Sequence, residues 1–206
     1  MRLFFDVETT GLPERNLPPN DPRQPHLVQL ACLLCEDDGT ERASVSLIVR
    51  PPVPIPDEVA AIHGITNGIA AAAGVPPAAA FGIWSNLARR AGTLVAHNIA
   101  FDEAIMLTAW CRQHVGSAEA AADDWARMHG DRERFCTMKA ATSIVNLPPT
   151  PKTLAAGMRR PKPPKLEECV RHFFGEDLAG AHDALVDVRA CARVYHHLKS
   201  LERAAA

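Results

Sequence analysis

Hydrophobic and polar residues alternate from Arg2 to Glu8, a pattern typical of a β-strand, and Thr9-Thr10-Gly11 ends it with turn residues. Two further apolar stretches follow at about 27–35 and 43–50, separated by a polar segment that contains Asp38-Gly39. An Asp-Gly pair between alternating hydrophobic residues is a strong hairpin signal. The N-terminal part is therefore predicted to form a three-stranded antiparallel meander.

The pattern changes to alternating helices and strands after this meander. Asn98 is expected to cap a helix that carries an apolar stripe to about Gln113. The expected elements are helices at 56–62 and 77–90, a buried strand at 93–97, the helix after Asn98, a short strand near 135–137 leading into a helix, and closing helices near 165–174 and 183–200. This order indicates an α/β fold, with a mixed five-stranded sheet and helices on both faces.

The composition fits one soluble domain. The chain has 206 residues, of which 47% are hydrophobic, which is enough for one sizeable core, and a single domain over residues 1–206 is expected. No apolar run approaches the roughly 18 residues that cross a bilayer, and the N-terminus lacks the apolar core of a signal peptide. The sequence therefore predicts a cytoplasmic protein without a membrane partner.

The six cysteines do not form a recognisable metal motif. Cys32 and Cys35 make a Cys-x-x-Cys pair inside the predicted strand 27–35, but no second pair follows at zinc-finger spacing. In the absence of a secretion signal, reduced and buried thiols are expected.

Charge offers one local candidate for nucleic-acid binding. The net charge is −2, so the chain as a whole has no general affinity for nucleic acid. The segment 148–165 is rich in proline and basic residues and contains no acidic residue. It is interpreted as a basic loop that either tracks a phosphate backbone, in a salt-sensitive and sequence-independent way, or is simply a solvated loop.

Asp6 and Glu8 are the first sign of chemistry. They lie two residues apart in a strand that otherwise looks central, so both carboxylates point to the same face. Neighbouring carboxylates near a core repel each other unless protons or a cation intervene, and Mg²⁺ and Mn²⁺ prefer hard oxygen ligands. The alternative is a solvated strand end, where two acids cost little.

Two later segments add acids and a histidine. Asp102 falls in the first turn of its predicted helix, where the helix dipole alone would favour a negative charge. Asp187 lies beside the apolar stripe of the last helix. His182 precedes it by five residues, which on one helix would separate the two by about 140°. His182 is therefore expected on the loop before this helix, leaning over a metal held by Asp187, although an exposed histidine in a capping segment is the alternative.

These residues occur in four segments spread over nearly the whole chain: Phe4-Phe5-Asp6-Val7-Glu8-Thr9-Thr10-Gly11-Leu12, His63-Gly64-Ile65-Thr66, His97-Asn98-x-x-Phe101-Asp102 and His182-x-Ala184-x-x-Asp187. In their order and spacing they resemble the DEDDh 3′–5′ exonucleases, the DnaQ-like proofreading exonucleases built on the ribonuclease H-like fold. His182 favours the branch with histidine at this position over the branch with tyrosine.

The resemblance implies a catalytic set of Asp6, Glu8, Asp102, His182 and Asp187. The four carboxylates would hold two Mg²⁺ ions, for which Mn²⁺ could substitute, and His182 would be the general base. The residues implied to contact the terminal nucleotide are Thr9, Ile62, His63, Asn98 and Phe101. For two of them another interpretation stays open, since Phe101 also fits a core position and His63 a plain loop contact.

The predicted function is hydrolysis of terminal phosphodiester bonds of DNA, in proofreading or repair, with release of nucleoside 5′-monophosphates. A 3′–5′ exoribonuclease is the alternative with the same chemistry, because the motifs address the phosphate and the metals and not the 2′-hydroxyl. A non-catalytic nucleic-acid or protein-binding module is the alternative of a different class. The expected partner is nucleic acid with a free 3′ end, and nothing in the sequence indicates a polymerase partner.

Overall fold

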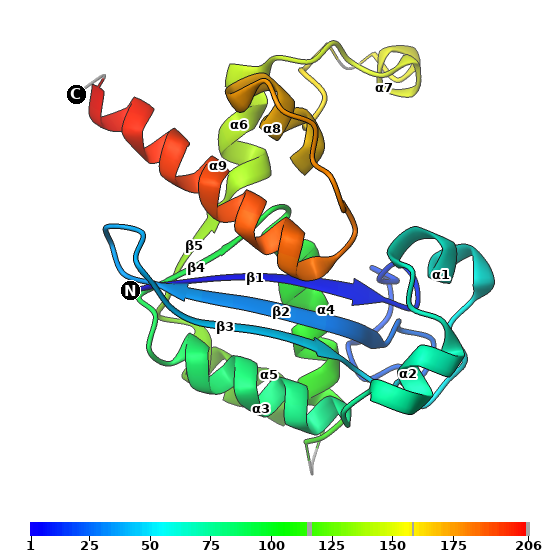
Figure 1. Ribbon diagram of the computed structural model, residues 1–206. Coiled ribbons are helices and arrows are strands. Elements are labelled where there is room, and N and C mark those ends of the chain that lie inside the picture. The colour runs from blue at the N-terminus through cyan, green and yellow to red at the C-terminus, as the bar shows by residue number, and fades with distance from the viewer. Residues whose placement is uncertain (115–116, 158, 205–206) are drawn as a thin grey trace.

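A mixed five-stranded sheet in the order β3-β2-β1-β4-β5 runs through the centre of the molecule (Figure 1). The computed structural model describes residues 1–114, 117–157 and 159–204. The strands are β1 (Arg2–Thr9), β2 (Leu27–Cys35), β3 (Glu41–Ile48), β4 (Thr93–Ala96) and β5 (Glu133–Cys136). β1, β2 and β3 pair antiparallel, whereas β4 and β5 run parallel to β1, so the predicted meander and mixed sheet are confirmed.

The meander forms where the sequence places its turn chemistry. Between β2 and β3, Gly39 has a φ of +93°, which glycine adopts without steric cost, and the Asp38 carboxylate accepts a hydrogen bond from the Thr40 amide at 2.8 Å. β2 is buried over its whole length because it lies between two other strands and is covered by helices on both faces.

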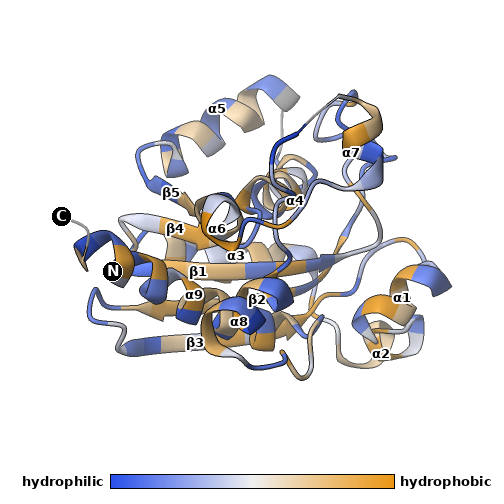
Figure 2. Ribbon diagram, turned by 90° about the horizontal axis from the view of Figure 1, so that it is seen from above, coloured by the Kyte–Doolittle hydropathy of each residue, from blue (hydrophilic) through white to orange (hydrophobic). Residues whose placement is uncertain are grey.

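Helices cover both faces of the sheet. One face carries α3, α4 and α5, whose apolar residues share a core with Leu3, Phe5 and Val7 of β1. The other face carries α9, which packs on Phe4, and α6 and α8 pack on α9 in turn. Figure 2, which looks onto the sheet from above, shows hydrophobic residues along β1 and β4. The helices are α1 (Asp57–His63), α2 (Asn67–Ala73), α3 (Pro77–Ala88), α4 (Ile99–Cys111), α5 (Ala118–His129), α6 (Thr137–Val145), α7 (Pro151–Ala155), α8 (Leu166–Phe174) and α9 (Ala184–Ala204).

This layering decides where the acids of β1 point. Side chains alternate across a strand, and Phe4 faces α9 while Phe5 and Val7 face α3 and α4. Asp6 and Glu8 therefore face the α9 side, at the end of β1 that lies nearest to α1 in Figure 1.

Three helices lie in segments where the sequence predicted none. α2 falls in the alanine-rich stretch before α3, α5 follows α4, and α7 lies inside the predicted basic loop. The predicted cap of α4 is also wrong in its detail, because the Asn98 side chain makes no capping hydrogen bond. Asn98 instead adopts a left-handed conformation with φ of +78°, which asparagine tolerates better than most residues.

The cysteines match the expectation of unpaired thiols. Cys32 and Cys35 are buried and point into the cores on opposite faces of the sheet, as their spacing in a strand requires. Burial raises the pKa of Cys35 to about 11, which keeps it protonated at neutral pH. Among the described residues, no helix is both long and apolar enough to span a membrane.

Candidate active site

Carboxylates from three elements meet at the C-terminal end of β1. Asp6 and Glu8 come from β1, Asp102 from the first turn of α4 and Asp187 from the first turn of α9. Burial raises the pKa of Asp6 well above its usual value, and the charges of Asp102, Asp187 and Glu8 raise it further. All four predicted acids therefore belong to one electrostatic cluster.

The pairing of β1 with β4 creates the space for this cluster. The two strands pair only from Arg2–Thr93 to Phe4–Val95, so β1 continues past the end of β4. The start of α4 fills the position beside the unpaired half of β1. Asp102 is only 2% exposed there, and its Oδ2 has no hydrogen-bond partner among the residues that the structure describes. Burial raises the pKa of Asp102, and the backbone amide of Val7 partly opposes this effect.

His182 lies on the loop before α9, where the five-residue spacing to Asp187 places it. Its backbone is left-handed, with φ of +71°, and its amide donates a hydrogen bond to Oδ2 of Asp187 at 2.9 Å. Asp183 accepts hydrogen bonds from the amides of Leu185 and Val186, which caps the start of α9. The loop thus turns sharply and holds the His182 backbone against Asp187.

The side chains of Glu8, His182 and Asp187 form a compact group of possible ligands. One potential ligand atom from each of the three lies within 4.8 Å of the other two. Burial and the charges of Asp187 and Asp183 raise the pKa of Glu8 to about 7. The pKa of Asp187 is also raised by burial, against the effect of the His182 amide.

This donor set fits divalent cations. Four carboxyl groups with raised pKa values are held together, and an oxygen of Asp102 is buried without a partner. Such an arrangement is unfavourable when the groups ionise alone and becomes favourable when a cation neutralises them. Oxygen-rich sites of this kind are typical of Mg²⁺ and Mn²⁺.

A cavity of about 560 Å³ opens beside His182. Of the five residues predicted to contact a terminal nucleotide, Asn98 and Phe101 line it, and the ring of Phe101 also packs against the core. The other lining residues are Leu12, His97, Met138, Pro163, Pro164, Lys165, Leu166, Glu167, Ala181 and His182. Phe101 therefore packs against the core and lines the cavity, and its contact with a nucleotide stays a prediction.

The other three predicted contacts do not line this cavity. Thr9 is buried, and its hydroxyl donates to the Gly11 carbonyl at 2.6 Å, so it shapes the turn after β1. His63 is buried near Thr9 and His182, accepts the Ile65 amide on Nδ1, and has no partner on Nε2. Ile62 is 57% exposed next to it. These residues stand beside the carboxylates and not in the cavity.

His97 and Leu12 are cavity residues to which the sequence assigned no role. The two ring nitrogens of His97 lie 2.9 Å from Oγ1 of Thr137 and 3.0 Å from the Pro164 carbonyl oxygen, so His97 ties β4 to α6 and to the segment before α8. Leu12 is 80% exposed at the cavity. Both residues belong to the segments that carry the family resemblance, but their position in the sequence does not show what either side chain contacts.

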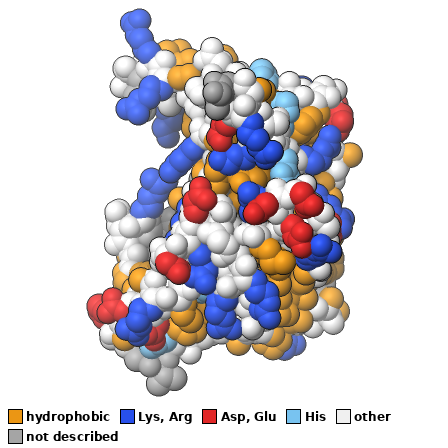
Figure 3. Space-filling view, turned by 90° about the vertical axis from the view of Figure 1, so that its left-hand side faces the viewer, with side chains coloured by type: hydrophobic (Ala, Val, Ile, Leu, Met, Phe, Trp, Pro, Cys, Tyr) orange, Lys and Arg blue, Asp and Glu red, His pale blue; other side chains and the backbone are white. Residues whose placement is uncertain are grey.

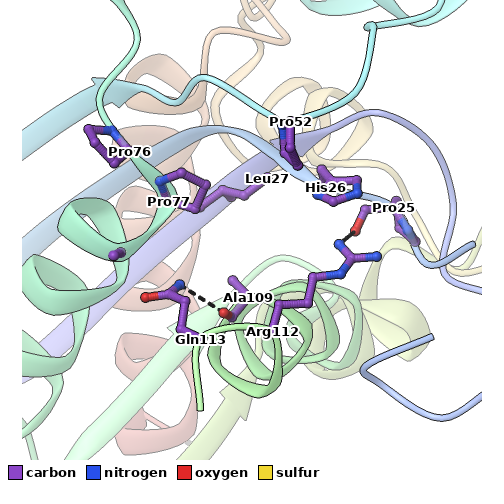
Figure 4. A pocket seen from close by; sticks show the side chains of 10 residues that line it. Pro25, His26, Leu27, Pro52, Pro76, Pro77, Ala109, Arg112 and Gln113 are labelled. Carbon is purple, nitrogen blue, oxygen red and sulfur yellow. Dashed lines mark hydrogen bonds between the residues drawn. The ribbon is translucent and has the colours of Figure 1, made fainter. Parts of the chain in front are cut away.

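A second pocket, of about 270 Å³, lies away from this chemistry. It is lined mostly by prolines and apolar side chains, together with His26, Arg112 and Gln113 (Figure 4). The Arg112 guanidinium donates to the carbonyl oxygens of Pro25, Asp21 and Gln24 at 2.8, 3.1 and 2.6 Å. Arg112 therefore anchors the loop after β1, and the pocket contains none of the predicted site residues.

Comparison with known proteins agrees with the family resemblance seen in the sequence. The model of a family described as "Exonuclease" (RNase_T) matches residues 3–195. Similar solved structures include E. coli exonuclease I with a dT13 oligonucleotide (TM-score 0.70, 20% identity, 96% of this chain and 40% of that one). They also include the zinc-bound form of the E. coli exonuclease I–ssDNA complex (0.71, 20%, 98% and 41%) and exonuclease I from Methylocaldum szegediense (0.69, 21%, 97% and 40%). No curated protein matches the chain.

These matches confirm the expected fold, since they cover nearly all of this chain. The chain spans only about 40% of the length of the exonuclease I chains, so the similarity is to one part of those proteins.

Proposed function

The chain belongs to the exonuclease family, and from this premise we propose that it is a metal-dependent 3′–5′ exonuclease acting on DNA, in proofreading or repair. The observation that carries the proposal is the cluster of Asp6, Glu8, Asp102 and Asp187 beside His182, at the edge of a cavity. A binding module has no use for four carboxyl groups whose pKa values are raised by burial in one place. The cluster is therefore interpreted as catalytic.

The four carboxylates would hold two divalent cations, Mg²⁺ with Mn²⁺ able to substitute. Asp6, Glu8 and Asp187 would hold the cation that activates the attacking water, and Asp102 would support the second. When bound, the cations would activate the attacking water and offset the negative charge that develops on the leaving 3′ oxygen. The unpaired Oδ2 of Asp102 and the raised pKa of Glu8 support this assignment.

His182 is assigned the general base. A neutral imidazole can take a proton from the attacking water, and the ring of His182 lies in one group with Glu8 and Asp187. The water oxygen then bonds to phosphorus, the bond from phosphorus to the 3′ oxygen breaks, and that oxygen takes up a proton. The products are a nucleoside 5′-monophosphate and a strand one nucleotide shorter with a 3′-hydroxyl.

The cavity would receive the terminal nucleotide. Phe101 offers an apolar surface that accepts any base, and Asn98 offers a polar group on the same wall. Thr9, Ile62 and His63 would contact the nucleotide from the β1 side. DNA is favoured over RNA because the similar exonuclease I structures carry single-stranded DNA, whereas a 2′-hydroxyl contact would be needed for an RNA enzyme.

The test is digestion of matched DNA and RNA single strands labelled at the 5′ end, with Mg²⁺, Mn²⁺ or EDTA. We expect a ladder that shortens from the 3′ end with metal and not with EDTA. The ladder should be absent for Asp187→Asn. Faster cleavage of DNA supports the proposal, and faster cleavage of RNA would assign the exoribonuclease alternative. A folded protein that binds Mn²⁺ and cleaves neither strand would contradict the proposed function.

A further inference from the structure

A basic arm projects from the molecule between α6 and α8. We use this name for the described residues 148–157 and 159–161, which contain α7 (Figure 1). The flanking residues Leu147 and Lys162 form an antiparallel bridge, in which the Lys162 amide donates to the Leu147 carbonyl at 3.0 Å. A segment of this length whose ends are hydrogen-bonded is an Ω-loop, a class that frequently carries function. The arm therefore has a closed neck and an outward tip.

The neck is fixed to the catalytic part of the molecule. The Lys162 ammonium lies 2.6 and 2.8 Å from the two carboxylate oxygens of Glu168 on α8. Two residues further on, the Pro164 carbonyl contacts the ring of His97, at the end of β4 just before α4. The orientation of the arm is thus coupled to the helix that presents Asp102.

The segment that directly follows the neck of the arm forms part of the cavity. Pro163, Pro164 and Lys165 line it on one side, and His182 lies on its wall as well. On the proposed function, a strand whose terminal nucleotide occupies the cavity can leave it past these residues. The phosphates upstream of the terminal nucleotide would therefore pass along the arm.

The charges on the arm differ from the other cations nearby. Lys152, Arg159 and Arg160 are exposed, and within the described residues none of the three forms an ion pair. Lys162 and Lys165, by contrast, are paired with Glu168 and Glu167. Figure 3 shows Lys and Arg side chains on the segment that projects at the upper left, where acidic side chains do not accompany them. No Asp or Glu occurs between residues 134 and 166.

We propose that the basic arm binds the phosphodiester backbone of a single strand upstream of the nucleotide being removed, through Lys152, Arg159 and Arg160. This proposal rests on the proposed function, because it takes the cavity as the site of the 3′ end. The contacts are independent of base sequence, since they are cation–phosphate contacts. The arm thus acts on long strands, and a substrate of one nucleotide does not reach it.

The test compares two matched double variants. Arg159→Gln/Arg160→Gln removes two charges from the arm, and Arg89→Gln/Arg90→Gln removes two exposed, adjacent charges at the end of α3, on the opposite side of the sheet. Binding of a 5′-fluorescein 20-nucleotide DNA strand is measured by anisotropy in EDTA. The arm variant is expected to raise Kd about tenfold at low salt and to flatten the slope of log Kd against log salt by about 1.4, or 0.7 per lost phosphate contact. The α3 variant keeps the wild-type slope.

Kinetics give a second readout. The ratio of kcat/KM for the 20-nucleotide strand to kcat/KM for the p-nitrophenyl ester of thymidine 5′-monophosphate is expected to fall about tenfold in the arm variant, and Arg159→Lys/Arg160→Lys is expected to restore it. Thermal unfolding checks that each variant is folded. An unchanged kcat/KM ratio and salt slope in the arm variant would overturn the proposed role of the arm. An equal loss of DNA binding in the α3 variant would do the same. If the wild type cleaves neither substrate, the proposed function fails, while the anisotropy comparison still decides for or against the arm.

Discussion

The backbone amide of His182 donates a hydrogen bond to Oδ2 of Asp187 over 2.9 Å, so the general base and the metal ligand proposed here hold each other in place. The left-handed backbone of His182 makes this contact possible, because it turns the chain just before α9 begins. One oxygen of Asp187 is thereby oriented by the main chain. The other is left for a cation, and the ring of His182 stays beside Glu8.

Asp187→Asn is expected to lower kcat at least about 100-fold, because the amide can still accept the His182 hydrogen bond but lacks the charge that a cation requires. The matched control is Asp183→Asn, whose side chain can cap α9 as the aspartate does. Single-turnover cleavage of a 20-nucleotide strand measures both. Equal activity of the two variants would remove Asp187 from the metal site.

His182→Asn tests the base with little disturbance of the backbone. Asparagine tolerates positive φ, whereas alanine at φ of +71° would add strain that mimics a catalytic defect. The expected result is a fall in kcat of about 10²- to 10⁴-fold with an unchanged affinity for Mn²⁺, measured by calorimetry. His172→Asn, at an exposed histidine of α8, is the control. Near-normal turnover of His182→Asn at neutral pH would show that the proton goes elsewhere.

The metal-free protein is expected to lose stability as the pH rises from 5 to 8. The pKa of Glu8 is about 7 in the folded protein, above its ordinary value of 4.5, because burial and then Asp187 and Asp183 raise it. Between these values the native state binds more protons than the unfolded state, so the free energy of unfolding decreases with pH.

Thermal unfolding in EDTA should therefore give a Tm that is lower at pH 8 than at pH 5, by roughly 3–8 °C. Mn²⁺ should raise Tm more at pH 8, where the carboxylates are ionised, than at pH 5. A metal-induced shift that is equal at both pH values would contradict the raised pKa values.

Asp102→Asn is expected to stabilise the metal-free protein at pH 8 while reducing activity. Its Oδ2 is buried without a partner, and removing an uncompensated buried charge removes a cost of about 1–3 kcal/mol. The amide oxygen can still accept the Val7 amide, whose effect on the pKa shows that it faces this carboxylate. Because burial raises the pKa of Asp102, protonation removes this charge as the pH falls, so the gain should shrink toward pH 5. Urea unfolding at both pH values measures this difference. A loss of stability of Asp102→Asn at pH 8 would contradict the prediction.

The parts of the fold that sequence predicted are those fixed by local periodicity. β1 alternates, β2 is continuously apolar, and Asp38-Gly39 marks the hairpin, so the meander follows from short-range rules. The sequence also predicted that His182 lies on the loop before α9, because a spacing of five residues on one helix would have turned His182 away from the face that carries Asp187.

Features that depend on contacts across the molecule were not predicted. Among its described side chains α5 buries Ala121, Trp125 and His129, and with one of the three polar this apolar stripe is too sparse to stand out. The His97 ring connects segments that are 40 and 67 residues away in sequence. Asn98 looks like a cap from its type and position, and only its φ of +78° shows that it is a turn residue.

Arg112→Met is expected to lower the free energy of unfolding by roughly 2–4 kcal/mol, because the three backbone carbonyls of the loop after β1 lose a charged donor while the apolar stem is kept. Limited trypsin digestion should then cut the loop faster at Arg15 and Arg23, which are both exposed. Arg127→Met, on the surface of α5 with its side chain 73% exposed, is the control and should change neither property. Since the loop continues from the turn that holds Thr9 beside the carboxylates, Arg112→Met should also raise KM for the DNA strand. Normal proteolysis together with normal KM would mean that the loop holds its position without the arginine.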